Sequence, residues 1–179
     1  MPPLPSHSLL EPRPSTLDLD TFIAHYGDIY EHSPWVAEAA WQQGLTAKHD
    51  QPGQLAELMG QMLQQASSDE QIKVIRAHPD LAGKAALAGD LTGDSTREQA
   101  GAGLDQCSPE ELARFEHLNA TYKHTFGFPF VIAVKGLDRH AILDAFAQRI
   151  DNDLASERRT AIEQIIRIAR LRLQARASG

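Results

Sequence analysis

Apolar residues recur along this chain at helical spacing rather than in strict alternation. Leu55, Leu58, Met59 and Leu63 fall on one face of a helix predicted over residues 54–65, because residues three and four apart share a helical face. The same reasoning predicts helices over residues 16–26, 35–43, 67–78, from 95, from 108 to a break at 126–130, and over 141–150 and 157–175, with one or two loose helical turns in 81–91. The pattern therefore predicts an all-α protein, a single compact domain of about eight helices.

Several of these helices begin and end at recognisable signals. The segments 67–70, 95–98 and 108–111 each pair a serine with a glutamate three residues later. In such a capping box each side chain binds the other residue's backbone N–H. Ser33 before Pro34 predicts another helix start, with serine as the N-cap. A helix is expected to stop near His78, because the following proline disfavours helical geometry there.

The segment Val131–Val134 is the only strongly strand-like run. No set of partner strands is predicted, so we expect a buried extended segment. Its backbone N–H and C=O groups need partners, and such a segment is suited to binding a ligand rich in amides. The alternative is a core segment in which the neighbouring phenylalanines, Phe126, Phe128 and Phe130, only pack.

Composition and charge limit the partners and the cellular location that we expect for the protein. The formal charge is −7 with no dense basic cluster, so nucleic acid is not an expected partner. No apolar run is long enough to cross a bilayer, and the N-terminus lacks a signal-peptide pattern. A cytoplasmic protein is the simplest interpretation. Five of the ten prolines lie within residues 1–14, which predicts a flexible tail over 1–15 before a helical domain over 16–175.

Motifs for metals and organic cofactors are missing from the sequence. There is no His-Glu-x-x-His, and one cysteine cannot form Cys-x-x-Cys. His117 and His124 could share a helix face, although a solvated pair is the commoner case. No glycine-rich nucleotide motif is present. Cys107 has no evident base beside it, so a nucleophilic role is not expected. We therefore expect neither a metal nor a cofactor.

Two titratable residues are candidates for chemistry. His78 lies at a helix end, where the dipole favours the imidazolium; alternatively it only caps that end. Glu98 belongs to a predicted capping box and has that structural role as its alternative. Ser95 and Gln99 flank it, and small residues follow, which would let a ligand approach the helix N-terminus.

The last predicted helix carries two arginines with different expected environments. Arg170 and Arg172 are two residues apart, so one can be solvated while the other turns into a pocket. The polar run Glu157–Arg159 at the start of this helix is interpreted as ordinary solvated surface.

Five segments follow one another in the order found in a known family. They are YEHSPWV at 30–36, AHPDLAG at 77–83, SxxEQxG at 95–101, FGFPFV at 126–131 and IARLRL at 168–173. Together they resemble the OHCU decarboxylase family, the 2-oxo-4-hydroxy-4-carboxy-5-ureidoimidazoline decarboxylases of urate breakdown. The resemblance covers residues 17–173.

The resemblance implies an all-helical homodimer without metal or organic cofactor, which converts OHCU to (S)-allantoin and CO₂. It places the catalytic histidine on His78 and the carboxylate-binding arginine on Arg172, with Arg170 as second choice. The substrate contacts that it implies fall on Pro79, Ser95, Thr96, Arg97, Glu98 and Gln99, and on the backbone of Phe130, Val131, Ile132, Ala133 and Val134.

We hypothesise that His78 transfers the proton and that Glu98 is its partner, binding the substrate hydroxyl or ureido N–H. Two other functions stay open at this point. One is a hydrolase of the same pathway, with Glu98 activating water. The other is a helical ligand-binding or adaptor domain without turnover.

Overall fold

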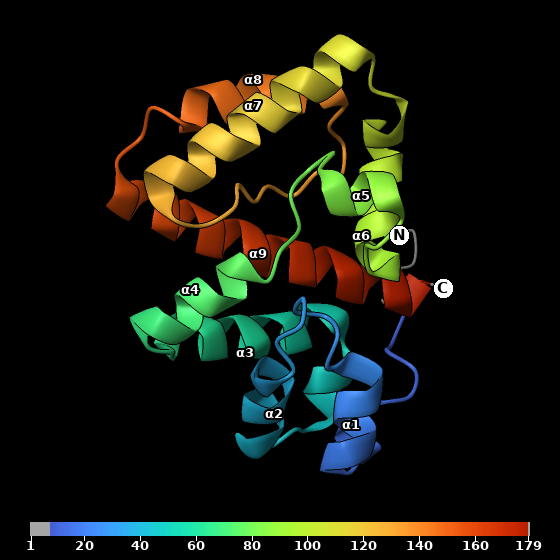
Figure 1. Ribbon diagram of the computed structural model, residues 1–179. Helices are drawn as coiled ribbons and strands as arrows, with labels where there is room; N and C mark the ends of the chain where they lie inside the picture. Colours follow the sequence, from blue (N-terminus) through green and yellow to red (C-terminus); the bar gives the residue numbers. More distant parts are fainter. Residues whose placement is uncertain (1–7, 179) are drawn as a thin grey trace, which may run out of the picture. The chain divides into compact units, whose positions relative to one another are not determined.

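The computed structural model describes residues 8–178. Within that range the chain forms nine α-helices and three short 3₁₀-helices, and no strand (Figure 1). The predicted all-α class is confirmed. The helices fall into two units, one reaching to Val74 and resuming at Ile166, the other comprising Ile75–Ile165. None of the helices in the described part of the chain is long and apolar enough to cross a membrane.

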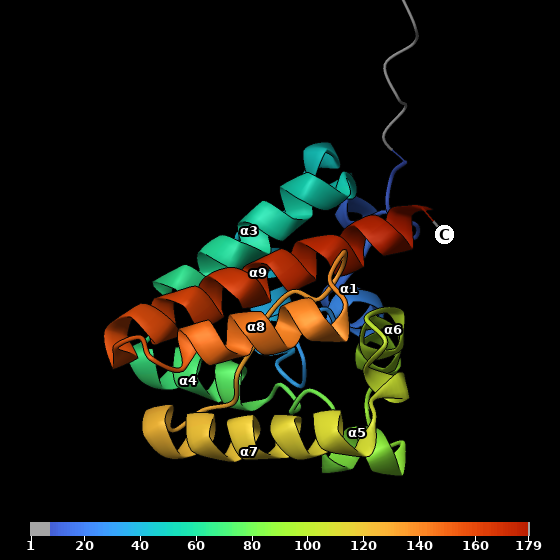
Figure 2. The same ribbon diagram turned by 90° about the horizontal axis from the view of Figure 1, so that it is seen from above.

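The first unit is built on three helices, α1 (Leu19–Tyr26), α2 (Trp35–Gln42) and α3 (Pro52–Gln65). In it α2 packs on both α1 and α3, as the blue and teal ribbons of Figure 1 show. Figure 2 shows the teal α3 along its full length. The unit also holds the 3₁₀-helices η1 (Pro14–Thr16) and η2 (Ala47–Asp50), most of α4 (Ser68–Arg76) and the second half of α9 (Leu154–Ser178). Burial of the apolar faces, such as Phe22, Val36 and Leu55, stabilises this unit.

The second half of the predicted tail, residues 8–15, makes contacts with the 3₁₀-helix η2. Residues 1–7 lie outside the described residues. Leu10 is fully buried and its N–H donates to the Asp50 carbonyl at 2.8 Å. Ser15 donates to the Asp50 carboxylate through its backbone N–H and its hydroxyl, both at 2.8 Å.

The second unit contains α5 (Lys84–Ala88), α6 (Gly93–Gly101), η3 (Leu104–Gln106), α7 (Pro109–Phe126), α8 (Arg139–Arg149) and the first half of α9. The yellow α7 and the orange α8 contact each other (Figure 1). Between them in sequence, residues 129–134 form neither helix nor strand, and Val131, Ala133 and Val134 are buried, as predicted for this segment. Phe130 stacks on Phe146 of α8 at 3.9 Å between ring centroids, and Tyr122 of α7 meets Phe130 edge-on at 5.4 Å.

Two of the three predicted capping boxes mark real helix starts. Ser67 Oγ accepts from the Glu70 N–H at 3.2 Å, at the start of α4. Ser108 and Glu111 each bind the other's backbone N–H, at 3.1 and 2.9 Å, at the start of α7. These local signals therefore define where α4 and α7 begin.

Two predicted N-caps are wrong. α6 begins at Gly93 with Thr92 as its N-cap, so Ser95 lies inside the helix and its N–H donates to Thr92 Oγ1 at 3.3 Å. Thr92, three positions earlier, is also among the preferred capping residues. α2 has Pro34 rather than Ser33 as its N-cap, because the Ser33 hydroxyl instead donates to the Glu31 carbonyl at 2.9 Å.

Candidate active site

His78 follows the end of α4, where the chain leaves the helix. Its N–H donates to the Ile75 carbonyl at 3.2 Å, which continues the last helical turn, and the following proline prevents further helix. Only 8% of the residue is exposed. The sequence prediction of a histidine at a proline-stopped helix end is confirmed, and burial makes this histidine unlike an ordinary surface cap.

A pocket of about 430 Å³ opens beside His78. Its lining comes from three segments of the second unit: Arg76, His78, Asp80, Lys123, Gly127, Phe128 and Pro129. Two fixed cations and one carboxylate therefore accompany the imidazole. Lys123 Nζ lies 2.6 Å from Asp80 Oδ2, and Arg76 Nε donates to the Gly127 carbonyl at 3.0 Å. The net charge of the lining is positive, which suits an anionic ligand.

The loop after His78 is fastened by polar side chains from α6 and α7. Gln99 accepts from the Ala82 N–H at 3.0 Å and donates to the Asp80 carbonyl at 3.3 Å. Asn119 of α7 donates to the Leu81 carbonyl at 3.0 Å. These bonds bring the C-terminal part of α6 next to the His78 loop, although the two segments are about twenty residues apart in sequence.

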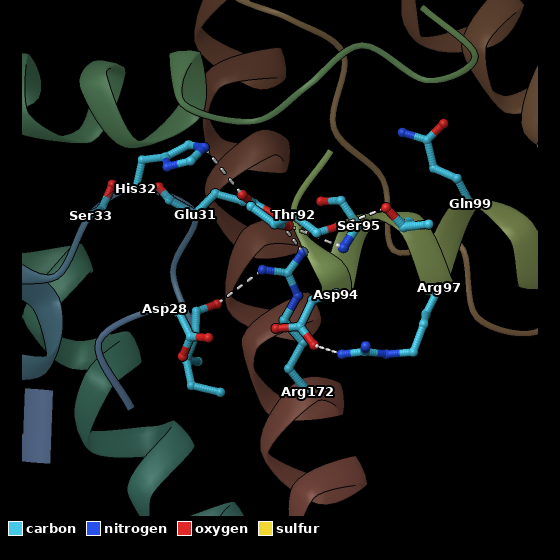
Figure 3. Close-up of polar contacts among 12 residues, drawn as sticks. Asp28, Glu31, His32, Ser33, Thr92, Asp94, Ser95, Arg97, Gln99 and Arg172 are labelled. Atoms are coloured by element: carbon cyan, nitrogen blue, oxygen red, sulfur yellow. Dashed lines mark hydrogen bonds and ion pairs between the residues drawn. The ribbon is translucent and has the colours of Figure 1, made fainter. Parts of the chain in front are cut away.

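The predicted ligand-contact residues of α6 differ in their surroundings. Ser95 and Gln99 are buried, at 5% and 6% exposure, whereas Thr96 and Arg97 are exposed. Arg97 pairs with Asp94 at 2.6 Å (Figure 3) and Thr96 donates to the Thr92 carbonyl at 2.9 Å. The Gln99 amide already binds the His78 loop, so its position depends on that loop.

Glu98 is partly buried on the same helix. Because α6 begins at Gly93, Glu98 is too far along the helix to cap it, and the capping interpretation is wrong. Neither Glu98 nor Pro79 is among the residues that line the pocket, although His78 and Asp80 on either side of Pro79 are. A direct meeting of the His78 and Glu98 side chains stays a prediction.

The backbone groups of the segment Phe130–Val134 differ in whether they have hydrogen-bond partners. The Val131 carbonyl accepts from Arg149 Nη1 at 2.7 Å, and the Ala133 N–H donates to Gln164 Oε1 at 2.9 Å. The Val134 carbonyl accepts from the Leu137 N–H at 2.9 Å. For the Ile132 N–H and C=O the described residues provide no hydrogen-bond partner. Ile132 therefore has the backbone groups that an amide-rich ligand could use.

Arg170 and Arg172 behave as their spacing predicts, since Arg170 is exposed and Arg172 is buried. Within the first unit, Arg172 Nη2 lies 3.1 Å from Glu31 Oε1, and its Nη1 donates to the Ile29 carbonyl at 3.2 Å (Figure 3). His32 Nε2 approaches the same carboxylate at 3.7 Å. A carboxylate already holds this guanidinium in place, and the predicted role of Arg172 in substrate binding stays a prediction.

Sequence reasoning missed one buried charge cluster. Glu157 was expected on solvated surface, yet it has no exposed surface and binds Arg149 and Tyr122 at 2.9 and 2.6 Å. A run of polar residues in the sequence does not show which of them is exposed, because that depends on which face of the helix is buried. Lys123, which lines the pocket, was missed because only the folded chain brings it to His78. Arg76 is two residues from His78, and its place in the lining was not predicted.

The remaining candidates have surroundings that favour structural roles. Burial is the largest cause that raises the pKa of the Cys107 thiol, which disfavours the nucleophilic thiolate. His117 and His124 are both exposed. Among the described residues no group of three or more His, Cys, Asp or Glu side chains is arranged to hold a metal.

The chain is similar to known proteins in its family pattern, its sequence and its structure. The family model for OHCU decarboxylase matches residues 15–174. The 2-oxo-4-hydroxy-4-carboxy-5-ureidoimidazoline decarboxylase of Haloferax volcanii is 40% identical over 173 residues, which is 97% of this chain and 99% of that protein. The uric acid degradation bifunctional protein PucL of Bacillus subtilis is 35% identical over 158 residues, which is 88% of this chain and 30% of that protein.

The solved structures agree with the family match. A crystal structure of an (S)-allantoin synthase superposes with a TM-score of 0.70 at 29% identity, covering 91% of this chain. This chain spans about half of that structure, 52%. On these grounds the chain belongs to the OHCU decarboxylase family of carboxy-lyases.

Proposed function

We propose that this protein decarboxylates OHCU to (S)-allantoin and CO₂ in urate degradation, using its own side chains and backbone. Family membership supports the reaction class. The observation that carries the assignment to a site is the buried imidazole of His78 in a pocket that also presents Arg76 and Lys123. An anionic ring compound is the class of ligand that such a pocket attracts.

For this reaction the protein must orient the substrate, stabilise negative charge and deliver one proton. Breaking the bond to the carboxylate leaves an electron pair, which the conjugated C=N and carbonyl groups of the substrate ring accept. One proton must then reach one face of the ring. We assign this proton transfer to His78, either directly or through the substrate hydroxyl, with Glu98 binding the hydroxyl or ureido N–H.

Other predicted contacts complete the proposal. The N–H and C=O groups of Ile132, which no described residue binds, would hold the amide edge of the ring, and Arg172 would counter the carboxylate. Pro79 and Ser95 would shape the site around His78. The Gln99 amide binds the loop of residues 80–82, so in this proposal it positions that loop beside the ligand.

The test generates OHCU in situ from urate and follows allantoin by its optical activity, with CO₂ release measured in parallel. His78→Ala is expected to lower kcat by about a hundred- to ten-thousand-fold, the range for lost general acid–base action. Glu98→Gln is expected to lower kcat less, because it keeps the size and part of the hydrogen bonding. His124→Ala, which changes an exposed histidine of α7, is the matched control and should leave kcat unchanged.

The outcomes separate the rival functions. Near-wild-type turnover by folded His78→Ala would refute the assignment of His78. Ring opening without CO₂ release would instead favour a hydrolase. A binding or adaptor domain would be favoured by two results together: the wild type does not accelerate the reaction, and His78→Ala still binds the ligand.

We further propose that the protein is a homodimer in the cytoplasm. The dimer is what the resemblance to the family implies, and the cytoplasmic location is the simplest interpretation of a sequence without a long apolar run. Sedimentation equilibrium should give twice the mass of the 19.7 kDa chain, and localisation of a tagged full-length chain should be cytoplasmic. A monomer at micromolar concentration would contradict the first part.

A further inference from the structure

The most deeply buried charged group of the second unit is linked through Arg149 to the segment Phe130–Val134. Glu157, at the start of α9, has no exposed surface. Its Oε1 accepts from Tyr122 Oη at 2.6 Å and from Arg149 Nε at 2.9 Å, and its Oε2 accepts from Asn152 Nδ2 at 3.0 Å. The carboxylate is thus fully supplied with donors from α7, α8 and the turn before α9.

Arg149 connects this carboxylate to the segment Phe130–Val134. While Nε binds Glu157, Nη1 donates to the Val131 carbonyl at 2.7 Å. The guanidinium carbon also lies 4.4 Å from the centre of the Phe130 ring, over its face. One side chain therefore holds both the ring of Phe130 and the backbone of the next residue.

The hydrogen bonds of the segment alternate along the chain. Val131 and Ala133 bind side chains of α8 and α9, Arg149 and Gln164. The intervening Ile132 has an N–H and a C=O that no described residue binds. This alternation is the one that an extended backbone produces, in which successive residues direct their N–H and C=O groups to opposite sides.

Stability alone gives little reason for such an ion pair. Burying two charges costs desolvation, and well-packed apolar residues often replace such pairs without loss. Here Arg149 Nη2 is in addition buried with no partner among the described residues. What an apolar replacement could not supply is the directed bond to the Val131 carbonyl.

We propose that Arg149, oriented by Glu157, is a positioning residue that fixes the segment Phe130–Val134 so that the Ile132 backbone faces the ligand. The ligand class is a ring with paired amide or imide donors and acceptors, and this part rests on the proposed function. Arg149 itself does not touch the ligand. A displaced segment weakens ligand binding, while proton transfer at His78 is affected less.

The experiment compares Arg149→Met, Arg149→Lys and Tyr122→Phe with wild type. Arg159→Met, an exposed arginine of α9, is the matched control. Hydrogen–deuterium exchange of the peptide containing residues 130–134 is measured without ligand and with (S)-allantoin. Kinetics of OHCU decarboxylation provide the second readout, and thermal melting reports the stability of each variant.

Arg149→Met is expected to speed exchange in the 130–134 peptide more than in α7, and to raise KM about tenfold, the effect of one well-placed hydrogen bond. The fall in kcat should be smaller. Arg149→Lys should restore part of both changes, because it keeps the charge but lacks the planar fork. Tyr122→Phe keeps the ring and should shift the exchange rate and KM in the same direction as Arg149→Met. This variant keeps the test decisive if Arg149→Met does not fold.

Two results would overturn the inference. One is a lowered melting temperature with exchange at 130–134 and KM equal to those of Arg159→Met. The other is a fall in kcat with unchanged KM. If wild type shows no OHCU turnover, the proposed function fails, yet the exchange measurement still decides the role of Arg149.

Discussion

Ala82 lies in the loop that follows His78, at a backbone φ of +50°. For a residue with a Cβ this left-handed conformation costs roughly 1–2 kcal/mol. Gln99 compensates by binding the Ala82 N–H and the Asp80 carbonyl together. The next residue, Gly83, is required by space, since a Cβ there would lie 2.7 Å from the Cβ of Asp80. The loop is thus held in a strained but defined shape beside the pocket.

Gln99→Leu tests whether this amide acts through the loop. The variant should lower the free energy of unfolding by about 1–3 kcal/mol, because the buried Ala82 N–H loses its acceptor. It should also lower kcat, because His78 is four residues from Ala82 and moves with the loop. Urea unfolding and the allantoin assay measure the two effects, with the exposed Gln148→Leu as control. Wild-type stability with a raised KM would show that Gln99 acts only as a ligand contact.

At the scale of elements, the sequence predicts what local signals control. The start of α7 follows from the reciprocal bonds of Ser108 and Glu111, and its end from Gly127, whose φ of +79° suits a glycine after a helix. The start of α6 was mispredicted at Ser95, because Thr92 offers the same chemistry nearby. Two hydroxyl residues three positions apart can compete for a cap, and the local sequence does not decide between them.

The site was predictable only in part, for a different physical reason. The position of His78 at a proline-stopped helix end follows from local geometry. Local geometry also predicts that Arg170 and Arg172 differ in burial, whereas the choice of Arg172 came from the resemblance to the family. The pocket itself depends on Lys123, which is 43 residues from its partner Asp80. The burial of Glu157 depends likewise on Tyr122, which is 35 residues away. Such pairings are fixed by packing between helices, for which a polar run carries no signal.

For the molecule as a whole, the three tyrosines share one property. Burial is in each case the largest cause that raises the pKa of the phenol, to about 12 for Tyr26 and further for Tyr30 and Tyr122. The hydrogen bond from Tyr122 to Glu157 adds to its shift, because the ionised phenol could not donate it. The folded protein therefore keeps three protons that the unfolded chain releases near the ordinary value of 10.0.

Alkaline solution should consequently unfold this protein. A raised pKa in the folded state contributes stability that is complete below pH 10 and is lost as the pH rises towards the folded values. Urea unfolding at intervals from pH 8 to 12 should show a falling midpoint, and phenolate absorbance near 295 nm should rise together with the loss of helical circular dichroism. Tyr122→Phe should make the fall with pH less steep, because one of the three released protons is gone. Phenolate absorbance that develops around pH 10 while the helices stay intact would contradict the burial of these rings.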